Sequence, residues 1–199
     1  MIQADQYFGV TKLGAYSSRV IKKFEQPVKK SYYDKIFSSE AMDKLNRQLM
    51  RKAIALSQAS VRSGTGGPFG AVIVKEGKII AQGQNQVTST KDPTAHAEIV
   101  AIREACRVLQ TFQLHGCELY TSCEPCPMCL GAIYWARLKK VYYANTQADA
   151  AQIGFDDQFI YDQLKLPLTR RHLPMIQLMR QEAWNVFQDW VEKTDKVEY

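Results

Sequence analysis

The chain is expected to fold around two short stretches, His96-Ala97-Glu98 and Pro125-Cys126-Pro127-Met128-Cys129. Imidazole nitrogens and cysteine thiolates are common zinc ligands, and zinc in proteins usually takes four ligands in tetrahedral geometry. His96, Cys126 and Cys129 supply three of them, which leaves one position open for a water, as in catalytic zinc sites. Because bound zinc lowers the pKa of its water from about 15.7 to roughly 7, we expect hydroxide to be available at neutral pH.

Glu98 lies two residues after His96, so its carboxylate can reach the same water. A carboxylate in that place can remove the water's proton and pass it to a substrate. The pattern H-x-E followed by P-C-x-x-C is typical of zinc-dependent nucleobase deaminases. The segment between His96 and Cys126 is long enough for a helix, a strand and a turn that bring the ligands together.

Cys123 offers an alternative, because it extends the motif to C-x-x-C-x-x-C. Together with His96, the three cysteines could close a structural Cys3His zinc site that has no open position. Such a site would leave Glu98 without a role. We expect instead that Cys123 ends a strand and that Cys126 opens a helix, where the helix dipole favours a thiolate.

The whole chain has 199 residues, of which 46% are hydrophobic and 23% charged, with a formal net charge of +6. This length and composition predict one globular domain with an appendage. The charge excess is mild and spread out, so it gives no reason to expect nucleic acid as a partner. No apolar run approaches the roughly 18 residues of a membrane span.

The cysteine content favours a reducing compartment. There are five cysteines, an odd number, and three of them lie in one motif. This pattern indicates a metal site and free thiols, not a disulfide framework, and we expect a cytoplasmic protein.

Residues 1–40 show no clear periodicity and are expected to form an N-terminal extension of unknown role. It could be an arm packed on the domain, a disordered segment or a transit peptide. Residues 41–199 are expected to form the deaminase domain.

Apolar spacing predicts the elements of this domain. Helices are expected over 42–63, 96–109 (capped by Thr94), 126–136, 149–153 and 181–193. Strands are expected over 69–74, 78–83, 117–122, 140–145 and 173–179. A hairpin followed by right-handed crossovers with parallel pairing would place the starts of both zinc-bearing helices on the same side of the sheet.

A family resemblance extends beyond the zinc motif. It lies in residues 66–74, 92–98, 120–137 and 154–157 and in the final Glu198-Tyr199. On these residues the chain resembles the cytidine deaminase-like zinc deaminases from about residue 45 to its end, and is most similar to the bacterial-type guanine deaminases. The resemblance implies a three-layer α/β/α fold with a five-stranded mixed sheet. It also implies one zinc per chain on His96, Cys126 and Cys129, with Glu98 as the proton shuttle.

The resemblance also implies substrate contacts. Asn85 matches the asparagine that holds the base, Asp157 the substrate-binding acid, and Phe69 an aromatic residue beside the base. Ala97 and Trp135 are further substrate-binding candidates. The physical chemistry agrees, because guanine's N–H groups need an acceptor such as Asp157, and an asparagine amide can pair with its carbonyl and ring nitrogens.

The C-terminal segment of such enzymes, here about residues 180–199, is swapped between two subunits, so the resemblance implies a homodimer. Tyr199 matches the tyrosine that closes the partner's pocket.

Each of these residues has a structural alternative. Asn85 could only form a turn, Asp157 could cap a helix, and Tyr199 could be a frayed terminus. Phe69 could belong to the core, and Trp135 could be either core or pocket wall.

The sequence therefore predicts hydrolytic deamination of guanine to xanthine and ammonia by a zinc enzyme. Three alternatives stay open: a guanosine deaminase, a tRNA adenosine deaminase and, from another class, a structural zinc scaffold. A tRNA enzyme would need an open basic groove, and a C-terminal lid ending in Glu198-Tyr199 argues against one.

Overall fold

The structure is a computed structural model that describes residues 39–155 and 157–198. Nearly all of the predicted N-terminal extension, and Tyr199, lie outside the described residues. The first described element is helix α3 (Ser39–Ser63), which begins three residues before the predicted start. The division of the chain at residue 40 stays a prediction.

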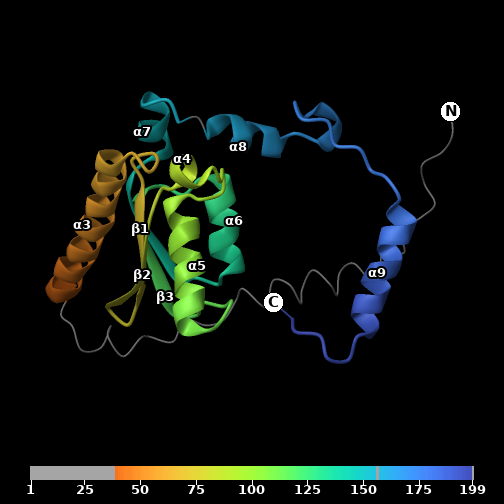
Figure 1. The fold of residues 1–199 in the computed structure, drawn as a ribbon, viewed down its shortest axis with the longest axis horizontal. Helices are drawn as coiled ribbons and strands as arrows, with labels where there is room; N and C mark the ends of the chain where they lie inside the picture. Colours follow the sequence, from red (N-terminus) through yellow and green to blue (C-terminus); the bar gives the residue numbers. More distant parts are fainter. Residues whose placement is uncertain (1–38, 156, 199) are drawn as a thin grey trace. The chain divides into compact units, whose positions relative to one another are not determined.

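Four strands form one mixed sheet in the order β2-β1-β3-β4 (Figure 1). β1 (Gly70–Lys75) and β2 (Lys78–Gln84) form the predicted hairpin. β3 (Cys117–Cys123) pairs antiparallel with β1, and β4 (Lys140–Asn145) pairs parallel with β3. The predicted parallel pairing is therefore confirmed for β4 but is wrong for β3, because β1 lies between β3 and β2.

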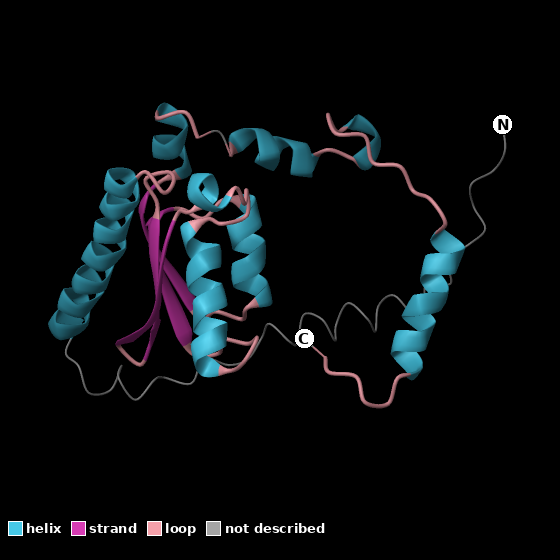
Figure 2. Ribbon diagram, viewed as in Figure 1, coloured by secondary structure: helices cyan, strands magenta, loops and turns pink. Residues whose placement is uncertain are grey.

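Helices cover both faces of this sheet, as the α/β/α prediction requires (Figures 1 and 2). α3 packs on one face, where its Leu49 and Ala53 join a cluster with Val72 and Val74 of β1. α5 (Ala97–Leu109) and α6 (Pro127–Trp135) pack on the other face, over Ala71 and Ile73. Because alternate residues of a strand point to opposite faces, the apolar run of β1 serves both layers.

The segments that follow β4 differ from the prediction. α7 (Gln147–Gln152) and α9 (Arg180–Glu192) were expected, within two residues at each end. α8 (Gln158–Lys165), a short 3-10 helix (Leu168–Arg170) and α4 (Val87–Thr90) were not expected.

The expected fifth strand over 173–179 is wrong, because these residues form no regular secondary structure and the described sheet has four strands. The large apolar side chains of this segment are all exposed, namely Leu173, Met175, Ile176, Leu178 and Met179. Among the described residues, no helix combines the length and the apolar character that a membrane span requires.

Candidate metal centre and active site

The three predicted zinc ligands lie at the beginnings of two neighbouring helices. His96 is the N-cap of α5 and Cys126 is the N-cap of α6, where Pro127 follows at the first helical position. Proline suits this position because the N–H it lacks would have no partner within the helix. Cys129 lies one turn into α6, and helical side chains point back toward the N-terminus. The prediction that the two helix starts converge is confirmed.

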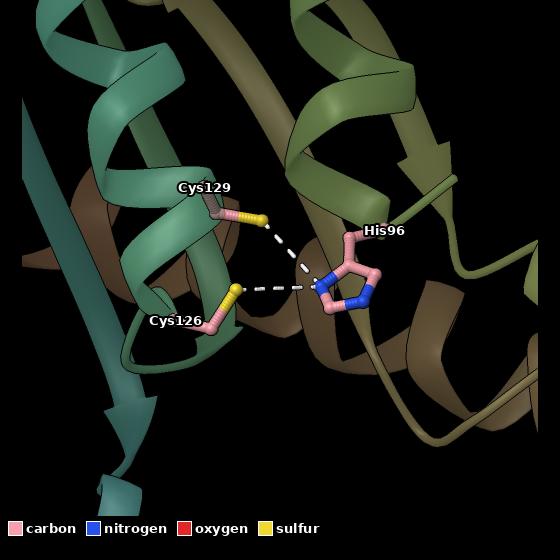
Figure 3. A group of neighbouring side chains, drawn as sticks. All are labelled: His96, Cys126 and Cys129. Carbon is pink, nitrogen blue, oxygen red and sulfur yellow. Dashed lines mark hydrogen bonds between the residues drawn. The ribbon is translucent and has the colours of Figure 1, made fainter. Parts of the chain in front are cut away.

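The spacing of the donor atoms fits zinc. Nδ1 of His96 lies 3.6 Å from Sγ of Cys126 and 3.6 Å from Sγ of Cys129 (Figure 3). All three ligand atoms lie within 4.8 Å of one another. In a tetrahedral site with Zn–N of about 2.0–2.1 Å and Zn–S of about 2.3 Å, nitrogen and sulfur are about 3.6 Å apart. His96, Cys126 and Cys129 therefore form a candidate zinc site.

The two thiol groups differ in their protonation. The hydrogen bond from Cys129 lowers the pKa of Cys126 to about 4 against the effect of burial, and His96 adds to the lowering. The same bond, together with burial, raises the pKa of Cys129. The pKa of His96 is raised, chiefly by its hydrogen bond to Cys126. With a pKa of about 4, Cys126 is a thiolate at neutral pH, and thiolate is the form of cysteine that binds metal.

Cys123 is not part of this group. It is the last residue of β3, as predicted, and its Sγ donates a hydrogen bond to the carbonyl of Thr146 at 3.6 Å. Burial raises the pKa of Cys123 to about 11, so it is a neutral thiol at pH 7. The cluster of possible metal ligands found in the described residues contains His96, Cys126 and Cys129 but not Cys123, which argues against a closed Cys3His site.

Glu98 lies in the first turn of α5 and is only 6% exposed. Burial raises the pKa of its carboxyl from 4.5 to about 7, opposed by its own backbone hydrogen bond, by the charge of His96 and by a hydrogen bond with Cys129. A carboxyl group with a pKa near 7 can both accept and release a proton at neutral pH. Glu98 thus has the location and the acidity of a proton carrier beside the metal ligands.

Asp92 holds the loop that precedes α5. Its Oδ1 accepts hydrogen bonds from the backbone N–H of Thr94 at 2.8 Å and from the Thr94 hydroxyl at 2.7 Å. Arg103 of α5 lies 3.6 Å from the second Asp92 oxygen. The predicted capping of α5 by Thr94 is therefore wrong, because the Thr94 hydroxyl is used by Asp92 and His96 occupies the N-cap position.

Asn85 follows β2 directly and is only 4% exposed. Its backbone N–H donates to the carbonyl of Phe69 at 3.0 Å. Its side-chain Oδ1 accepts hydrogen bonds from the N–H groups of Gly67 and Val87, each at 3.2 Å. Two donors at one amide atom identify it as the oxygen, so Nδ2, a donor, is the end of the amide left for a ligand.

Phe69 belongs to an aromatic pair, of which the sequence analysis found only one member. Its ring meets that of Phe155 edge-on, with the centroids 4.8 Å apart. A Cβ on Gly67 would lie 2.9 Å from the Phe155 ring and 3.0 Å from the Phe69 ring, so a glycine is needed there. Phe155 lies in the resemblance stretch 154–157, and an aromatic residue beside paired aspartates was the signal available.

The other predicted site residues are placed differently from one another. Ala97 is a fully buried first residue of α5, where backbone N–H groups have no partner within the helix. Asp157 stands at the N-cap position of α8 but makes no side-chain capping bond, and its charge is among those that raise the pKa of His96. Trp135 lies at the far end of α6, is 62% exposed and contacts Arg137, so the core alternative is wrong and the pocket-wall alternative stays a prediction.

The chain is similar to known zinc deaminases over most of its length. Residues 43–145 match the family model of the cytidine and deoxycytidylate deaminase zinc-binding region. Guanine deaminase of Bacillus subtilis is 56% identical over 150 residues, which cover 75% of this chain and 96% of that protein. Its crystal structure superposes with a TM-score of 0.75 at 55% identity and covers 77% of this chain and 98% of that chain.

Two further relatives are more distant or shorter in their match. A guanine deaminase structure from Nitrosomonas europaea has a TM-score of 0.53 at 28% identity, with 79% of each chain covered. The tRNA-specific adenosine deaminase of Aquifex aeolicus is 56% identical over 77 residues, which cover 39% of this chain and 51% of that protein. The similarity thus extends over almost the full length of the Bacillus guanine deaminase but over only half of this tRNA deaminase.

Proposed function

Because this chain belongs to the cytidine and deoxycytidylate deaminase family of zinc proteins, we propose that it hydrolyses guanine to xanthine and ammonia. One observation supports guanine most strongly: the match to Bacillus subtilis guanine deaminase covers 96% of that protein. Adenosine in tRNA is the second candidate substrate, supported by the match to the Aquifex enzyme, which covers 51% of that protein.

His96, Cys126 and Cys129 would hold the zinc. When bound, zinc supplies a water acidic enough to act as a nucleophile at neutral pH. Three protein ligands would leave a fourth position open to a water. The N-termini of α5 and α6 converge at the metal ligands, and the positive ends of the two helix dipoles would favour negative charge there. This arrangement stabilises charge that develops on the substrate during attack.

Glu98 moves the protons. It takes one from the attacking water and delivers it to the ring nitrogen beside carbon 2, and it then helps to protonate the amine so that ammonia leaves. The reaction consumes one water and releases one ammonia. Burial of Glu98 next to the metal ligands supports this role, because its carboxyl and the reacting atoms are then shielded from bulk water.

The base is held by groups of opposite hydrogen-bonding character. Asn85 offers Nδ2 as a donor to an acceptor atom of the purine, and Asp157 offers a carboxylate to the purine's N–H groups. The backbone N–H of Ala97 is a further donor. The aromatic pair Phe69 and Phe155 forms an apolar wall beside the base. Such matched polar groups disfavour analogues that lack a partner atom.

We also propose a homodimer in which the C-terminal segments, about residues 180–199, are exchanged. The apolar face of α9 supports this, because Trp184, Phe187 and Trp190 are 46%, 64% and 44% exposed within the chain. Contiguous exposed apolar surface of this kind usually marks an interaction site. A second copy of this chain would cover this face. Its Tyr199 would reach the substrate pocket, and Trp135 remains a candidate for the pocket wall.

The proposed location is the cytoplasm. None of the five cysteines is in a disulfide. Free thiols near a metal site persist where the surroundings are reducing.

Products formed by purified, zinc-loaded protein test the proposed function. Guanine, guanosine, adenine, cytosine and tRNA are supplied separately, and we expect xanthine and ammonia in equal amounts from guanine. Xanthosine formed from guanosine with higher kcat/KM would assign the nucleoside as substrate. Inosine in tRNA without xanthine would select the second candidate, and no product from any substrate at full zinc occupancy would select a structural scaffold.

A further inference from the structure

Ser60 links helix α3 to Asn85. Its side chain is fully buried, and its Oγ donates a hydrogen bond to the main-chain carbonyl of Asn85 at 3.0 Å. Serine hydroxyls within helices usually bond to a carbonyl of the preceding turn. Ser57 and Ser63 of the same helix do so, to Ile54 and Ala59, each at 2.8 Å. Ser60 instead directs its hydroxyl out of the helix, to Asn85, the residue that follows β2.

With this bond, the protein holds every hydrogen-bonding group of Asn85 but one. The backbone N–H is bonded to Phe69, the side-chain Oδ1 to Gly67 and Val87, and the backbone carbonyl to Ser60. Within residues 39–155 and 157–198, the Nδ2 of Asn85 makes no hydrogen bond. The position of Asn85 is therefore fixed by the protein, and its Nδ2 is the one donor group that can bind a ligand.

The turn between α3 and β1 holds Asn85 from a second side. A Cβ on Gly66 would collide with Asn85 Oδ1 and lie 2.7 Å from its carbonyl oxygen, so the turn and Asn85 are in close backbone contact. The turn is in turn fixed to the end of α3. Thr65 donates its N–H to the carbonyl of Ser60 at 3.3 Å, and its hydroxyl lies 3.4 Å from that of Ser60 and 3.1 Å from that of Ser63.

We propose that Ser60 is a positioning residue for substrate binding, which acts by fixing the main chain of Asn85 so that Nδ2 points at the purine. The inference rests on the proposed role of Asn85 in holding the base. Ser60 does not touch the substrate, because it is fully buried in α3. Without its hydroxyl, the Asn85 carbonyl would be a buried acceptor that has lost its donor, and the peptide would tilt to find another. The Asn85 side chain moves with that peptide.

If Ser60 acts in this way, its loss should affect substrate binding but not the chemical step. Loss of the Ser60 hydroxyl should weaken substrate binding, whereas the proton transfers of Glu98 depend on α5 and should continue. Ser60→Ala should raise the KM for guanine about three- to tenfold, the effect of one hydrogen bond, and change kcat by less than about twofold. Ser57→Ala is the matched control, because its hydroxyl bonds only within α3. It should change neither constant.

A double-mutant cycle identifies the residue through which Ser60 acts. In an Asn85→Ala background, Ser60→Ala should have no further effect on KM, because the side chain that it positions is gone. An equal increase in KM with and without the Asn85 side chain would overturn the proposal. Zinc content and melting temperature of each variant show that the fold is retained.

A spectroscopic readout keeps this test independent of the substrate. The side-chain amide signals of Asn85 in a proton–nitrogen correlation spectrum are identified by their loss in Asn85→Ala. They should shift or broaden in Ser60→Ala and stay in place in Ser57→Ala. Unchanged signals in Ser60→Ala would overturn the positioning role, whereas wild-type protein that makes no xanthine would overturn only the proposed function.

Discussion

Glu98 is the residue whose chemistry depends most on its surroundings. A carboxyl group with an ordinary pKa near 4.5 would be ionised at pH 7, and burial raises the pKa of Glu98 to about 7. The position of Glu98 beside His96 can be predicted from the sequence because both lie in one short motif. Its acidity cannot, because burial results from the packing of α5 and α6 on the sheet.

Replacing Glu98 with glutamine tests its role in proton transfer. The amide is nearly isosteric, so Glu98→Gln should keep its zinc and still bind purine, but it cannot accept and return a proton. We expect kcat for guanine to fall about 100- to 10,000-fold. The measurement is steady-state kinetics together with zinc per chain, and a variant within a few-fold of wild type would assign the proton transfer to another group.

Substituting two buried cysteines in turn, Cys129 and Cys123, distinguishes a zinc site with an open position from a closed Cys3His site. Cys129→Ala removes one of three proposed ligands and should lose zinc, whereas Cys123→Ala removes a thiol bonded to a backbone carbonyl and should retain about one zinc per chain. Both substitutions truncate a buried side chain, so each controls for the packing loss in the other. Metal analysis after gel filtration gives the answer. Loss of zinc from a folded Cys123→Ala protein would mean that the site is closed.

At the scale of elements, the bounds of helices and strands can be predicted where they depend on the local spacing of apolar residues. The helices that present His96 and Cys126 and the strands before them were predicted within about two residues, because their apolar residues recur with a regular period. The pairing of β3 with β1 was not, because strand order depends on contacts distant in sequence. The prediction of a fifth strand at 173–179 failed for a related reason: its apolar residues suit a strand, but none of the strands in residues 39–155 and 157–198 pairs with them.

Some errors in the site have a similar cause. Thr94 is a common residue type at helix N-caps, but His96 occupies the N-cap position of α5 and the Thr94 hydroxyl is bonded to Asp92. Phe155 lies in the resemblance stretch 154–157, but its contact with Phe69 could not be predicted because it joins two segments distant in sequence. The link between Ser60 and Asn85 likewise depends on the packing of α3 against the end of β2.

The close approach of α5 to β2 sets the position of His96 and can be tested with two glycines. A Cβ on Gly83 would collide with the Ala97 carbonyl and lie 2.7 Å from the backbone nitrogen of Ala101, so α5 would have to move. Gly83→Ala should lower the free energy of unfolding by about 1–3 kcal/mol and weaken zinc binding. The measurements are chemical denaturation and competition with a zinc chelator.

Gly131→Ala is the control for this experiment. Gly131 lies inside α6, and a Cβ there would meet nothing within 4 Å. Alanine should therefore raise the free energy of unfolding by about 0.5–1 kcal/mol and leave zinc affinity unchanged. A Gly83→Ala protein as stable and as tight for zinc as wild type would contradict the close packing of β2 and α5.

At the scale of the whole molecule, the comparisons confirm the predicted family. It could be predicted because its zinc motif lies in short contiguous stretches of sequence. The C-terminal part is different. The aromatic face of α9 and the apolar residues of 173–179 are exposed, and the proposed exchange of this segment between two copies would cover them.

Exchange can be tested by complementation. Deleting residues 196–199 should leave a folded, zinc-loaded dimer with greatly reduced activity, because the tail is proposed to exclude water from the pocket. Mixing this deletion with Glu98→Gln chains should restore activity in hybrid dimers, where one chain supplies Glu98 and the other supplies the tail. Each variant alone is the control. No recovery in confirmed hybrid dimers would place the tail in its own subunit or outside catalysis, and a fully active deletion would select the latter.

The most direct test of a zinc-dependent guanine deaminase is xanthine formation from guanine during removal and return of zinc. Activity should fall in proportion as a chelator lowers the metal content, because His96, Cys126 and Cys129 provide the only proposed site for the ion. It should return as zinc is restored to about one per chain. Undiminished conversion of guanine by zinc-depleted protein, or no xanthine from protein with full zinc, would contradict the account.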